Sequence, residues 1–412
     1  MTGRNHRAAT ALMLLAGLLA SCGTGEERVP SAIAAVTAQG CTISGSGRDD
    51  VLRGTPRADT LCGLGGHDVL IGGGDGDTLI GGQGSDALYG GAGPDTLDGG
   101  EGIDLLEGGP RRDLLDGGPG GDRCEPNQRD RAISCWGPGK APVIAAAGDI
   151  VCAADVSPSE NACRQRATSR LLVRRDPWAV LTTGDNQYED GRLADFHAAY
   201  STSWGRVKAI TRPSVGNHEY HVAGARDYFS YFGPPAGRRG RGYYSFDVGD
   251  WHLVALNSNC GEVGGCERGS PQEKWLRRDL AAHPSTCTLA YWHHPRFSSA
   301  LHGNSALPAA FWRALYDAGA DVVLNGHDHA YERFAPQDPR QRADPAGIRE
   351  FVVGTGGRNH YGFGTPEPNS EVRNSNTFGV LELTLRADGY DWRFVPEAGG
   401  TFEDSGTDTC SA

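Results

Sequence analysis

The chain has 412 residues and a formal net charge of −12 at pH 7, so it is long enough for two domains. The acidic balance and the absence of a basic stripe along the sequence argue against a nucleic-acid-binding protein. No segment contains the roughly 18 consecutive apolar residues that a membrane-spanning helix needs.

Residues 1–22 have the pattern of an export signal with a lipobox. Basic side chains at residues 4–7 are followed by an apolar run of 13 residues, 8–20, which is too short for a stable transmembrane helix. The run ends in Leu-Ala-Ser-Cys, which resembles a bacterial lipobox with Cys22 as the lipidated first residue. We therefore expect a lipoprotein on the outer face of the cell membrane, which it contacts only through the lipid anchor. The alternative is a secreted protein, with an ordinary signal cleaved near residues 32–38.

The number of cysteines is consistent with export. Without Cys22, ten of the 11 cysteines remain, an even number that suits disulfides in an oxidising compartment. No CxxC pair is present, which argues against structural zinc. Sequence alone does not fix the connectivity, but proximity favours five pairs, namely Cys41–Cys62, Cys124–Cys135, Cys152–Cys163, Cys260–Cys266 and Cys287–Cys410.

Residues 41–125 form the first predicted domain and contain nine copies of a nine-residue repeat. Gly is the first residue of every copy, and Leu is the eighth in eight copies, from Leu52 to Leu115, with Cys124 in the ninth. This GGxGxDxUx pattern resembles the parallel β-roll of the repeats-in-toxin (haemolysin-type) proteins. The sixth residue of every copy is Asp, and these are Asp50, Asp59, Asp68, Asp77, Asp86, Asp95, Asp104, Asp113 and Asp122.

The repeat has a physical interpretation. Gly permits the unusual backbone of tight turns, and the eighth residue points inward and stacks on its neighbours. The Asp carboxylates lie in the turns, where they and backbone carbonyls can surround Ca²⁺, an ion that prefers six to eight oxygens. Residues 41–125 carry a net charge of −10, so we expect this domain to fold only with calcium. A flexible spacer, the alternative, has no reason to keep Asp and Leu in register. Three copies have Arg48, Arg57 or Arg111 in place of a turn Gly, and we expect these copies to bind weakly or to act as caps.

Residues 126–141 contain Pro, Gly and Asn and indicate a linker to a catalytic domain, residues 142–412. In this domain, short apolar runs alternate with helical patterns before an antiparallel hairpin, which predicts an α/β fold. The predicted strands are 143–147, 179–183, 251–256, 286–292, 321–325 and 351–353, the predicted helices are 161–175, 271–282 and 305–318, and the hairpin joins 378–385 to 390–395.

Five short motifs place carboxylate, phenol, amide or imidazole groups directly after predicted strands, where open α/β sheets build ligand sites. The ligands are oxygen and nitrogen only, and they are numerous enough for two metal ions about 3.5–4 Å apart. The motifs are Gly148-Asp149-Ile150, Gly184-Asp185-Asn186-Gln187-Tyr188, Gly216-Asn217-His218-Glu219, His293-His294-Pro295 and Gly326-His327-Asp328-His329.

The order and spacing of these motifs resemble the calcineurin-like metallophosphoesterases, and among them the purple acid phosphatases, over roughly residues 142–396. The motif GDxxY is the discriminating one, because many relatives use Asp-x-His in the first motif, where this chain has Val151. Tyr188 supplies the missing ligand, as in the purple phosphatases. One departure is that those enzymes usually have Gly at the position of Val151. The resemblance implies a two-sheet metallophosphoesterase sandwich flanked by helices, with the β-roll preceding it.

The resemblance also implies a ligand set for a binuclear centre in which the Asp185 carboxylate bridges the two ions. A phenolate suits Fe³⁺ in the first site, and Zn²⁺, Fe²⁺ or Mn²⁺ would occupy the second. The implied first-site ligands are Asp149, Asp185, Tyr188 and His329, and the implied second-site ligands are Asp185, Asn217, His293 and His327.

His218 and His302 stand where the family has histidines that do not bind metal, and we expect them to stabilise the transition state and to protonate the leaving alcohol. Glu219 is a candidate to orient His218. His294 has either a supporting role at the metal centre or none, and Arg358 is a candidate phosphate contact. The histidines that belong to no motif are His221, His252, His283 and His360.

The sequence therefore predicts an exported metal-dependent phosphatase that hydrolyses phosphomonoesters by two-metal activation of water. A phosphodiesterase, a nucleotidase or a phospholipid-headgroup hydrolase would use the same site. A calcium-dependent surface-binding protein with a vestigial enzyme domain is a third hypothesis, which the complete ligand set disfavours.

Overall fold

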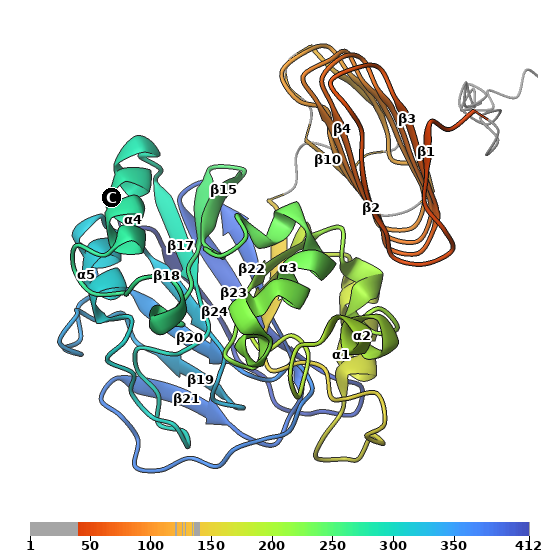
Figure 1. Cartoon of the computed structure of the whole chain (residues 1–412). Coiled ribbons are helices and arrows are strands. Elements are labelled where there is room, and N and C mark those ends of the chain that lie inside the picture. The colour runs from red at the N-terminus through yellow and green to blue at the C-terminus, as the bar shows by residue number, and fades with distance from the viewer. Residues whose placement is uncertain are drawn as a thin grey trace, which may run out of the picture. The chain divides into compact units, whose positions relative to one another are not determined.

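The computed structural model describes residues 40–411 except residues 120–121, 126, 128, 134 and 136–140 (Figure 1). The predicted export signal, with Cys22, lies outside the described residues, as does much of the predicted linker. Within the described part of the chain, no helix combines the length and the apolar character needed to cross a membrane.

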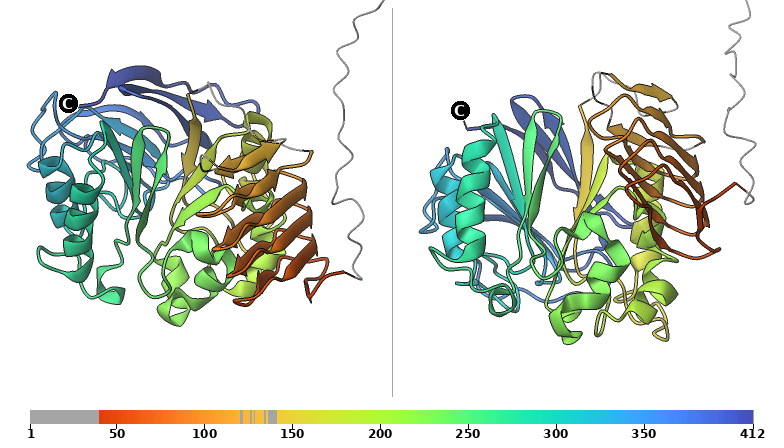
Figure 2. Two further views of the ribbon diagram at one scale, coloured as in Figure 1. Left: turned by 90° about the horizontal axis from the view of Figure 1, so that it is seen from above. Right: turned by 45° about the horizontal axis from the view of Figure 1, so that its top comes forward.

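The repeats form two stacked parallel sheets, seen in Figure 2 as the ladder of red and orange strands. One sheet has the order β1-β3-β5-β7-β9-β11 and the other β10-β8-β6-β4-β2, so neighbouring strands are two repeats apart. The strands are β1 Ile43–Ser44, β2 Val51–Arg53, β3 Thr60–Gly65, β4 Val69–Gly73, β5 Thr78–Gln83, β6 Ala87–Gly91, β7 Thr96–Glu101, β8 Leu105–Glu107, β9 Leu114–Asp116, β10 Arg123–Glu125 and β11 Arg131–Ile133.

The eighth residues of the repeats fill the space between these two sheets, as predicted. The leucines from Leu61 to Leu115 are fully buried and form one cluster, with Leu52 and Cys124 packed at its ends. In register, Leu61 pairs with Leu79 and Leu70 with Leu88. Each leucine therefore stacks on the leucine two repeats away, and this single apolar column is the core of the roll.

The two sheets of the roll differ on their outer faces. In the sheet that contains β4, β6 and β8, the seventh residues Val69, Ala87 and Leu105 are buried and cluster with Ala209, which precedes β14. In the other sheet, the corresponding residues are threonines, Thr60, Thr78 and Thr96. The apolar face therefore packs on the C-terminal part of the chain, and an 18-residue alternation in the repeats encodes it.

Polar contacts accompany this packing. The buried Lys208 ammonium donates a 2.7 Å hydrogen bond to the His67 carbonyl, and Ser85 Oγ donates a 2.6 Å bond to the Arg206 carbonyl. These partners lie in the fifth positions of two repeats and in the segment 206–208. The roll thus has specific contacts with the C-terminal domain in addition to the covalent connection.

The C-terminal domain is a sandwich of two sheets, ordered β14-β13-β12-β22-β23-β24 and β15-β16-β17-β18-β20-β19-β21 (Figure 1). The strands are β12 Val143–Ala147, β13 Ala179–Thr183, β14 Thr211–Ser214, β15 Tyr244–Val248, β16 Trp251–Ala255, β17 Cys287–Tyr291, β18 Val322–Asn325, β19 Tyr331–Phe334, β20 Arg349–Val353, β21 Ser370–Asn374, β22 Gly379–Arg386, β23 Gly389–Pro396 and β24 Ser405–Thr409.

The core lies between the sheets, where Leu181 and Leu383 of the first contact the cluster that contains Leu253 and Leu289 of the second. Helices cover the outer faces, as the sequence predicts for the fold. Leu172 of α1 packs on the first sheet, and further apolar residues of α4 and α5 pack on the second. The helices are α1 Gln165–Arg175, α2 Leu193–Asp195, α3 Arg226–Phe232, α4 Pro271–Ala282 and α5 Ala309–Asp317.

All five predicted disulfides are present: Cys41–Cys62, Cys124–Cys135, Cys152–Cys163, Cys260–Cys266 and Cys287–Cys410. Strands β12 and β13 and helix α4 have the predicted bounds. Helix α1 begins at Gln165 and not at 161, because Cys163 has a left-handed backbone (φ 61°) that a helix cannot contain.

Candidate metal centre

The five motifs lie at the carboxyl ends of β12, β13, β14, β17 and β18. These strands run parallel within their sheets, so their ends bring the motif side chains to one edge of the sandwich. Asp149, Asp185 and His327 have φ values of 59°, 47° and 67°. A left-handed backbone is unfavourable for non-glycine residues and concentrates at functional sites, which marks this edge as a candidate site.

The four predicted ligands of the first metal have converged. The Tyr188 hydroxyl lies 2.9 Å from Asp149 Oδ1, 3.0 Å from Asp185 Oδ2 and 3.0 Å from His329 Nε2. His329 Nε2 in turn lies 3.2 Å from Asp149 Oδ1. Atoms that share a metal at about 2.0–2.2 Å are separated by such distances, so the four donors suit one cation.

The four predicted ligands of the second metal converge on the other side of Asp185. His293 Nε2 lies 3.3 Å from Asp185 Oδ2, 3.0 Å from Asn217 Oδ1 and 3.2 Å from His327 Nδ1. Asp185 Oδ2 therefore belongs to both groups of donor atoms. A carboxylate shared in this way is what a bridge between two cations requires.

Hydrogen bonds outside the donor groups fix the histidine rings. His293 Nδ1 lies 2.9 Å from the Thr183 carbonyl, and His329 Nδ1 lies 3.0 Å from Asn359 Oδ1. Each Nδ1 therefore carries the proton, which leaves the Nε2 lone pair directed at the donor group. The support from Asn359 was not predicted, although its neighbour Arg358 was a candidate phosphate contact.

The electrostatics of the cluster also favour cations. Burial, together with the charges of Asp149 and Asp185, raises the pKa of the Tyr188 phenol well above its usual value. Burial opposes ionisation of Asp185, but attraction to His293 holds the Asp185 pKa well below its usual range. A buried phenol beside two carboxylates becomes a phenolate ligand only when a cation compensates the charge.

Comparison with known proteins agrees with this geometry. Residues 143–331 match the Calcineurin-like phosphoesterase family. The chain carries a calcineurin-like phosphoesterase domain. Four overlapping matches between residues 44 and 125 are to the RTX calcium-binding nonapeptide repeat.

Relatives of this phosphoesterase domain are purple acid phosphatases. Purple acid phosphatase 22 of Arabidopsis thaliana is 36% identical over 246 residues, 53% of this chain and 54% of the relative. Purple acid phosphatase 15 of the same plant is 30% identical over 223 residues, 45% of this chain and 41% of the relative. The chain thus spans about half the length of these relatives or less. A purple acid phosphatase from yellow lupin seeds has the same fold, with a TM-score of 0.52 at 20% identity over 67% of this chain and 55% of that one.

The two predicted catalytic histidines of the phosphoesterase domain border the donor groups from opposite sides. The ring of His218 lies 4.3 Å from that of Tyr188, and its Nδ1 lies 2.5 Å from the Glu189 carbonyl. The ring of His302 lies 4.2 Å from that of His327, and its Nδ1 lies 3.1 Å from Asp328 Oδ1. In both rings Nδ1 has a partner, and Nε2 of His218 lies 3.8 Å from Asp185 Oδ2.

Glu219 has a different role from the predicted one. The structure places its buried carboxylate as acceptor of backbone N–H groups of Asn186, Gln187 and Gly216, at 2.7, 3.2 and 2.7 Å. Glu219 therefore ties the loops after β13 and β14 together, whereas His218 is held by the Glu189 carbonyl. The sequence could not show this, because a Glu beside a His in the chain suggests a direct contact.

We expect Glu219→Gln to destabilise the phosphoesterase domain by about 2 kcal/mol, since a buried N–H group left without an acceptor costs about 1–3 kcal/mol. Gln has the same shape, but its amide group would face an N–H donor with another donor. Denaturant unfolding would measure the loss, with the exposed Glu262→Gln as control. A variant as stable as the control would show that the loops do not depend on this carboxylate.

Three further residues lie beside the donor groups. His294 is partly buried, with its ring 4.4 Å from that of His327 and its Nδ1 2.8 Å from Ser258 Oγ. Arg358 lies over the ring of Tyr188 at 5.0 Å and pairs with Glu189. Tyr361, which the sequence did not reveal, stacks on His329 at 3.9 Å.

The roll contains a second kind of candidate metal site. Asp68 Oδ1 accepts a 2.7 Å hydrogen bond from the Asp50 N–H, and the same bond, between residues 18 apart, recurs in the following repeats. The other oxygen, Oδ2, is buried without a hydrogen-bond partner in seven residues, namely Asp68, Asp77, Asp86, Asp95, Asp104, Asp113 and Asp122.

The surroundings of these seven oxygens suit calcium. A Cβ at Gly63 would collide with Asp68 Oδ2 and with the Gly81 carbonyl oxygen, and Gly72 and Gly81 have equivalent neighbours. Each turn thus directs a carboxylate and a carbonyl oxygen to one point. Burial, and then the charge of neighbouring carboxylates, raises the pKa of Asp68 to about 8 and that of Asp104 to about 9. A dication removes the cost of burying these charges.

The first two repeats differ in a way that supports the predicted capping role. Asp50 Oδ2 accepts hydrogen bonds from the backbone N and Oγ of Ser46, at 2.7 and 2.8 Å. Asp59 Oδ2 has the same partners in Thr55, both at 2.7 Å. A local hydroxyl satisfies the carboxylate here in place of a cation. The repeat with Arg111 lacks this feature, and Asp113 Oδ2 is among the unpartnered atoms.

Proposed function

We propose that this protein is an exported metal-dependent phosphatase that hydrolyses phosphomonoesters with water activated between two metal ions. The observation that carries the proposal is the position of Asp185 Oδ2, 3.0 Å from Tyr188 and 3.3 Å from His293, where it joins two complete donor groups. The relatives named purple acid phosphatases support the same chemistry.

Each of the two ions would have its own set of ligands. Asp149, Tyr188 and His329 would hold Fe³⁺ with Asp185, because a phenolate is a hard anionic donor. Asn217, His293 and His327 would hold Zn²⁺, Fe²⁺ or Mn²⁺ with the same carboxylate. When bound, the ions supply a water of lowered pKa and neutralise the charge of the phosphoryl oxygens.

Two histidines would supply proton transfer and charge stabilisation. Asp328 accepts from the His302 backbone N–H at 2.8 Å and from its ring Nδ1 at 3.1 Å, so His302 presents Nε2 toward the second donor group. From there it can give a proton to the leaving alcohol. His218 is held by Glu189 beside the first donor group and stabilises charge on the phosphoryl oxygens.

His294 would serve as a neutral hydrogen-bond donor. Ser258 Oγ accepts the His294 backbone N–H at 3.0 Å and lies 2.8 Å from its Nδ1. When the Ser258 hydroxyl donates a hydrogen bond to Nδ1, the proton of the neutral ring is on Nε2. Burial, and then the nearby His293, lowers the pKa of His294 to about 3, so this ring would approach a phosphoryl oxygen uncharged.

We further propose that the roll binds Ca²⁺ through Asp68, Asp77, Asp86, Asp95, Asp104, Asp113 and Asp122, with Asp50 and Asp59 in the capping repeats. Calcium is abundant outside cells, where an export signal and five disulfides would place the protein. In this proposal, the lipid on Cys22 anchors it to the membrane, and residues 142–412 form the catalytic domain after the 126–141 linker.

The test is hydrolysis of an aryl phosphate and a bis-aryl phosphate by the purified full chain with calcium and transition metals supplied. We expect turnover of the monoester to exceed that of the diester by at least about 10-fold, a difference of about 1.4 kcal/mol in activation free energy. Preference for the diester would redefine the protein as a phosphodiesterase. Absence of turnover of either, with both metals bound, would overturn the proposal and favour a surface-binding protein.

A further inference from the structure

A second cluster of imidazole and carboxylate groups lies away from the phosphoesterase site, between β16 and α4. His252 comes from β16, Asp279 lies on α4, and His283 directly follows that helix. Asp279 and His283 are four residues apart and share one face of the helix end. None of the three belongs to a motif that the proposed function uses.

The donor atoms of this cluster lie close together. His252 Nε2 is 3.0 Å from Asp279 Oδ2, and His283 Nδ1 is 3.6 Å from Asp279 Oδ1. The two imidazole rings stack at 4.7 Å. One ligand atom from each of the three residues falls within 4.8 Å of the other two. His283 Nδ1 also lies 2.9 Å from the Asp279 backbone carbonyl. Rotation of the exposed ring away from this carbonyl would bring three donors to one ion.

The surroundings of His252 are those of a metal-binding histidine. Its Nδ1 lies 2.8 Å from Asp247 Oδ1 and can keep its proton there. Its Nε2 is hydrogen-bonded to Asp279 Oδ2 at 3.0 Å, and a metal ion would displace the proton of this bond. Ser245 Oγ donates a 2.8 Å hydrogen bond to Asp279 Oδ1 and orients that carboxylate as well. His252 and Asp279 are thus each oriented by a hydrogen bond with a neighbouring side chain, as ligands in zinc sites are.

The charges also leave room for a cation. Among the ion pairs of the described residues, Asp247 and Asp279 have only histidine partners. The Asp279 side chain is 8% exposed and that of His252 only 1%, so the charge of Asp279 is poorly solvated. A dication would compensate it while both imidazoles stay neutral.

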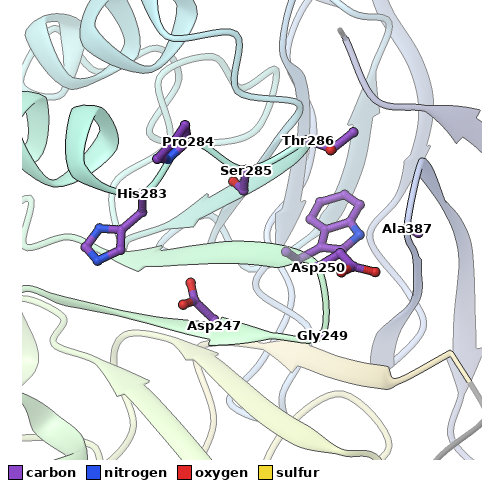
Figure 3. A pocket seen from close by; sticks show the side chains of 9 residues that line it. Asp247, Gly249, Asp250, His283, Pro284, Ser285, Thr286 and Ala387 are labelled. Atoms are coloured by element: carbon purple, nitrogen blue, oxygen red, sulfur yellow. The ribbon is translucent and has the colours of Figure 1, made fainter.

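A pocket of about 520 Å³ borders the cluster at His283 (Figure 3). Its lining includes Asp247 and His283, whose side chains are labelled on the same side of the picture, and Asp250 and Ala387, labelled on the other. The side chain of His283 is 46% exposed and that of Asp247 is 64% exposed. An ion can therefore approach the cluster from solvent at His283.

We propose that His252, Asp279 and His283 bind a divalent transition-metal ion of the zinc type, separate from the binuclear centre and from the calcium sites. Three nitrogen and oxygen ligands plus one water complete the tetrahedral arrangement that zinc prefers. The ion joins the end of α4 to β16 and stabilises this edge of the second sheet.

The experiment measures the zinc content of the full chain after equilibrium dialysis against buffered free Zn²⁺, with calcium present. The wild type retains about one equivalent more than His283→Ala, because three protein ligands are the usual minimum for a tight site. His283 is half exposed, so the variant folds, and its rate of phosphate release should equal that of the wild type. Zinc should also raise the melting temperature of the wild type more than that of the variant.

The matched control is His197→Ala, which removes a histidine of similar exposure, 42%, whose single carboxylate neighbour Asp49 lies 3.9 Å away. It should retain the zinc content of the wild type. Equal zinc content in the wild type and His283→Ala overturns the proposal. His252 would then be an imidazolium that bridges Asp247 and Asp279. A loss of zinc together with a loss of phosphate release also overturns it, since the missing ion would then belong to the binuclear centre.

Discussion

Replacement of Asp185 by Asn is expected to lower the turnover of aryl phosphates by at least about 1,000-fold, or roughly 4 kcal/mol of transition-state stabilisation. Asp185 Oδ2 contacts Tyr188 of one donor group and His293 of the other, at 3.0 and 3.3 Å. A neutral amide removes the negative charge that would bridge the two ions, so both sites weaken together. Phosphate release and metal content would be measured on the same sample, and both should fall.

The matched control is Asp190→Asn, the same substitution in a neighbouring loop. Asp190 is partly exposed and pairs with Arg192 and His221, outside the donor groups. This variant should keep its metals and its rate within about twofold, since surface ion pairs contribute little. Because Asp185 is buried, Tyr188→Phe provides a milder second variant, in which the ring still packs on His218 but one ligand is lost. Full turnover in both active-site variants would contradict the two-metal proposal.

The strands that carry the candidate ligands could mostly be predicted from the sequence, because buried strands are short apolar runs and their ends define the sheet edge. Strand β13, Ala179–Thr183, is such a run and ends directly before Gly184 and Asp185. Strand β14 was missed, since Thr211–Ser214 contains Arg and Pro and has no apolar pattern, although all four residues are buried. Only tertiary packing makes this segment a strand.

The supporting contacts of the site could not be predicted. Asn359 orients His329 from 30 residues away, and Glu219 joins two loops through backbone N–H groups. Neither the distance nor the partner of such a bond is encoded in local spacing. The same holds for His252 and His283, which belong to no motif and meet only because α4 packs beside β16.

For the roll, the sequence contained a pattern that the prediction did not use. The repeats predicted the stacked leucines, but their seventh positions from Val51 to Leu105 also alternate between apolar residues and Thr with a period of 18 residues. That alternation distinguishes the sheet that packs near Ala209 from the sheet that does not. A calcium-binding spacer would not need it, so the pattern indicates that the roll is built to contact the phosphoesterase domain.

Removal of calcium is therefore expected to unfold the roll and to destabilise the phosphoesterase domain as well. Seven buried carboxylate oxygens without partners would repel one another, and the single leucine column cannot offset this cost. With the roll unfolded, Val69, Ala87 and Leu105 no longer cover Ala209, and Lys208 loses its bond to His67. Far-UV circular dichroism should report the loss of strands, and the melting temperature of the enzyme should fall by several degrees.

Lys208→Met separates these two effects, because it removes the ammonium but keeps the apolar stem that is buried beside the roll. We expect the roll of this variant to fold with calcium as before, while calcium raises the melting temperature of the phosphoesterase domain less than in the wild type. Lys274→Met, which changes an exposed lysine on α4, serves as the control and should behave as the wild type. If calcium protects the phosphoesterase domain equally in both variants, the bond from Lys208 carries none of the coupling. If calcium leaves the wild-type melting temperature unchanged, the roll binds beside the domain without stabilising it.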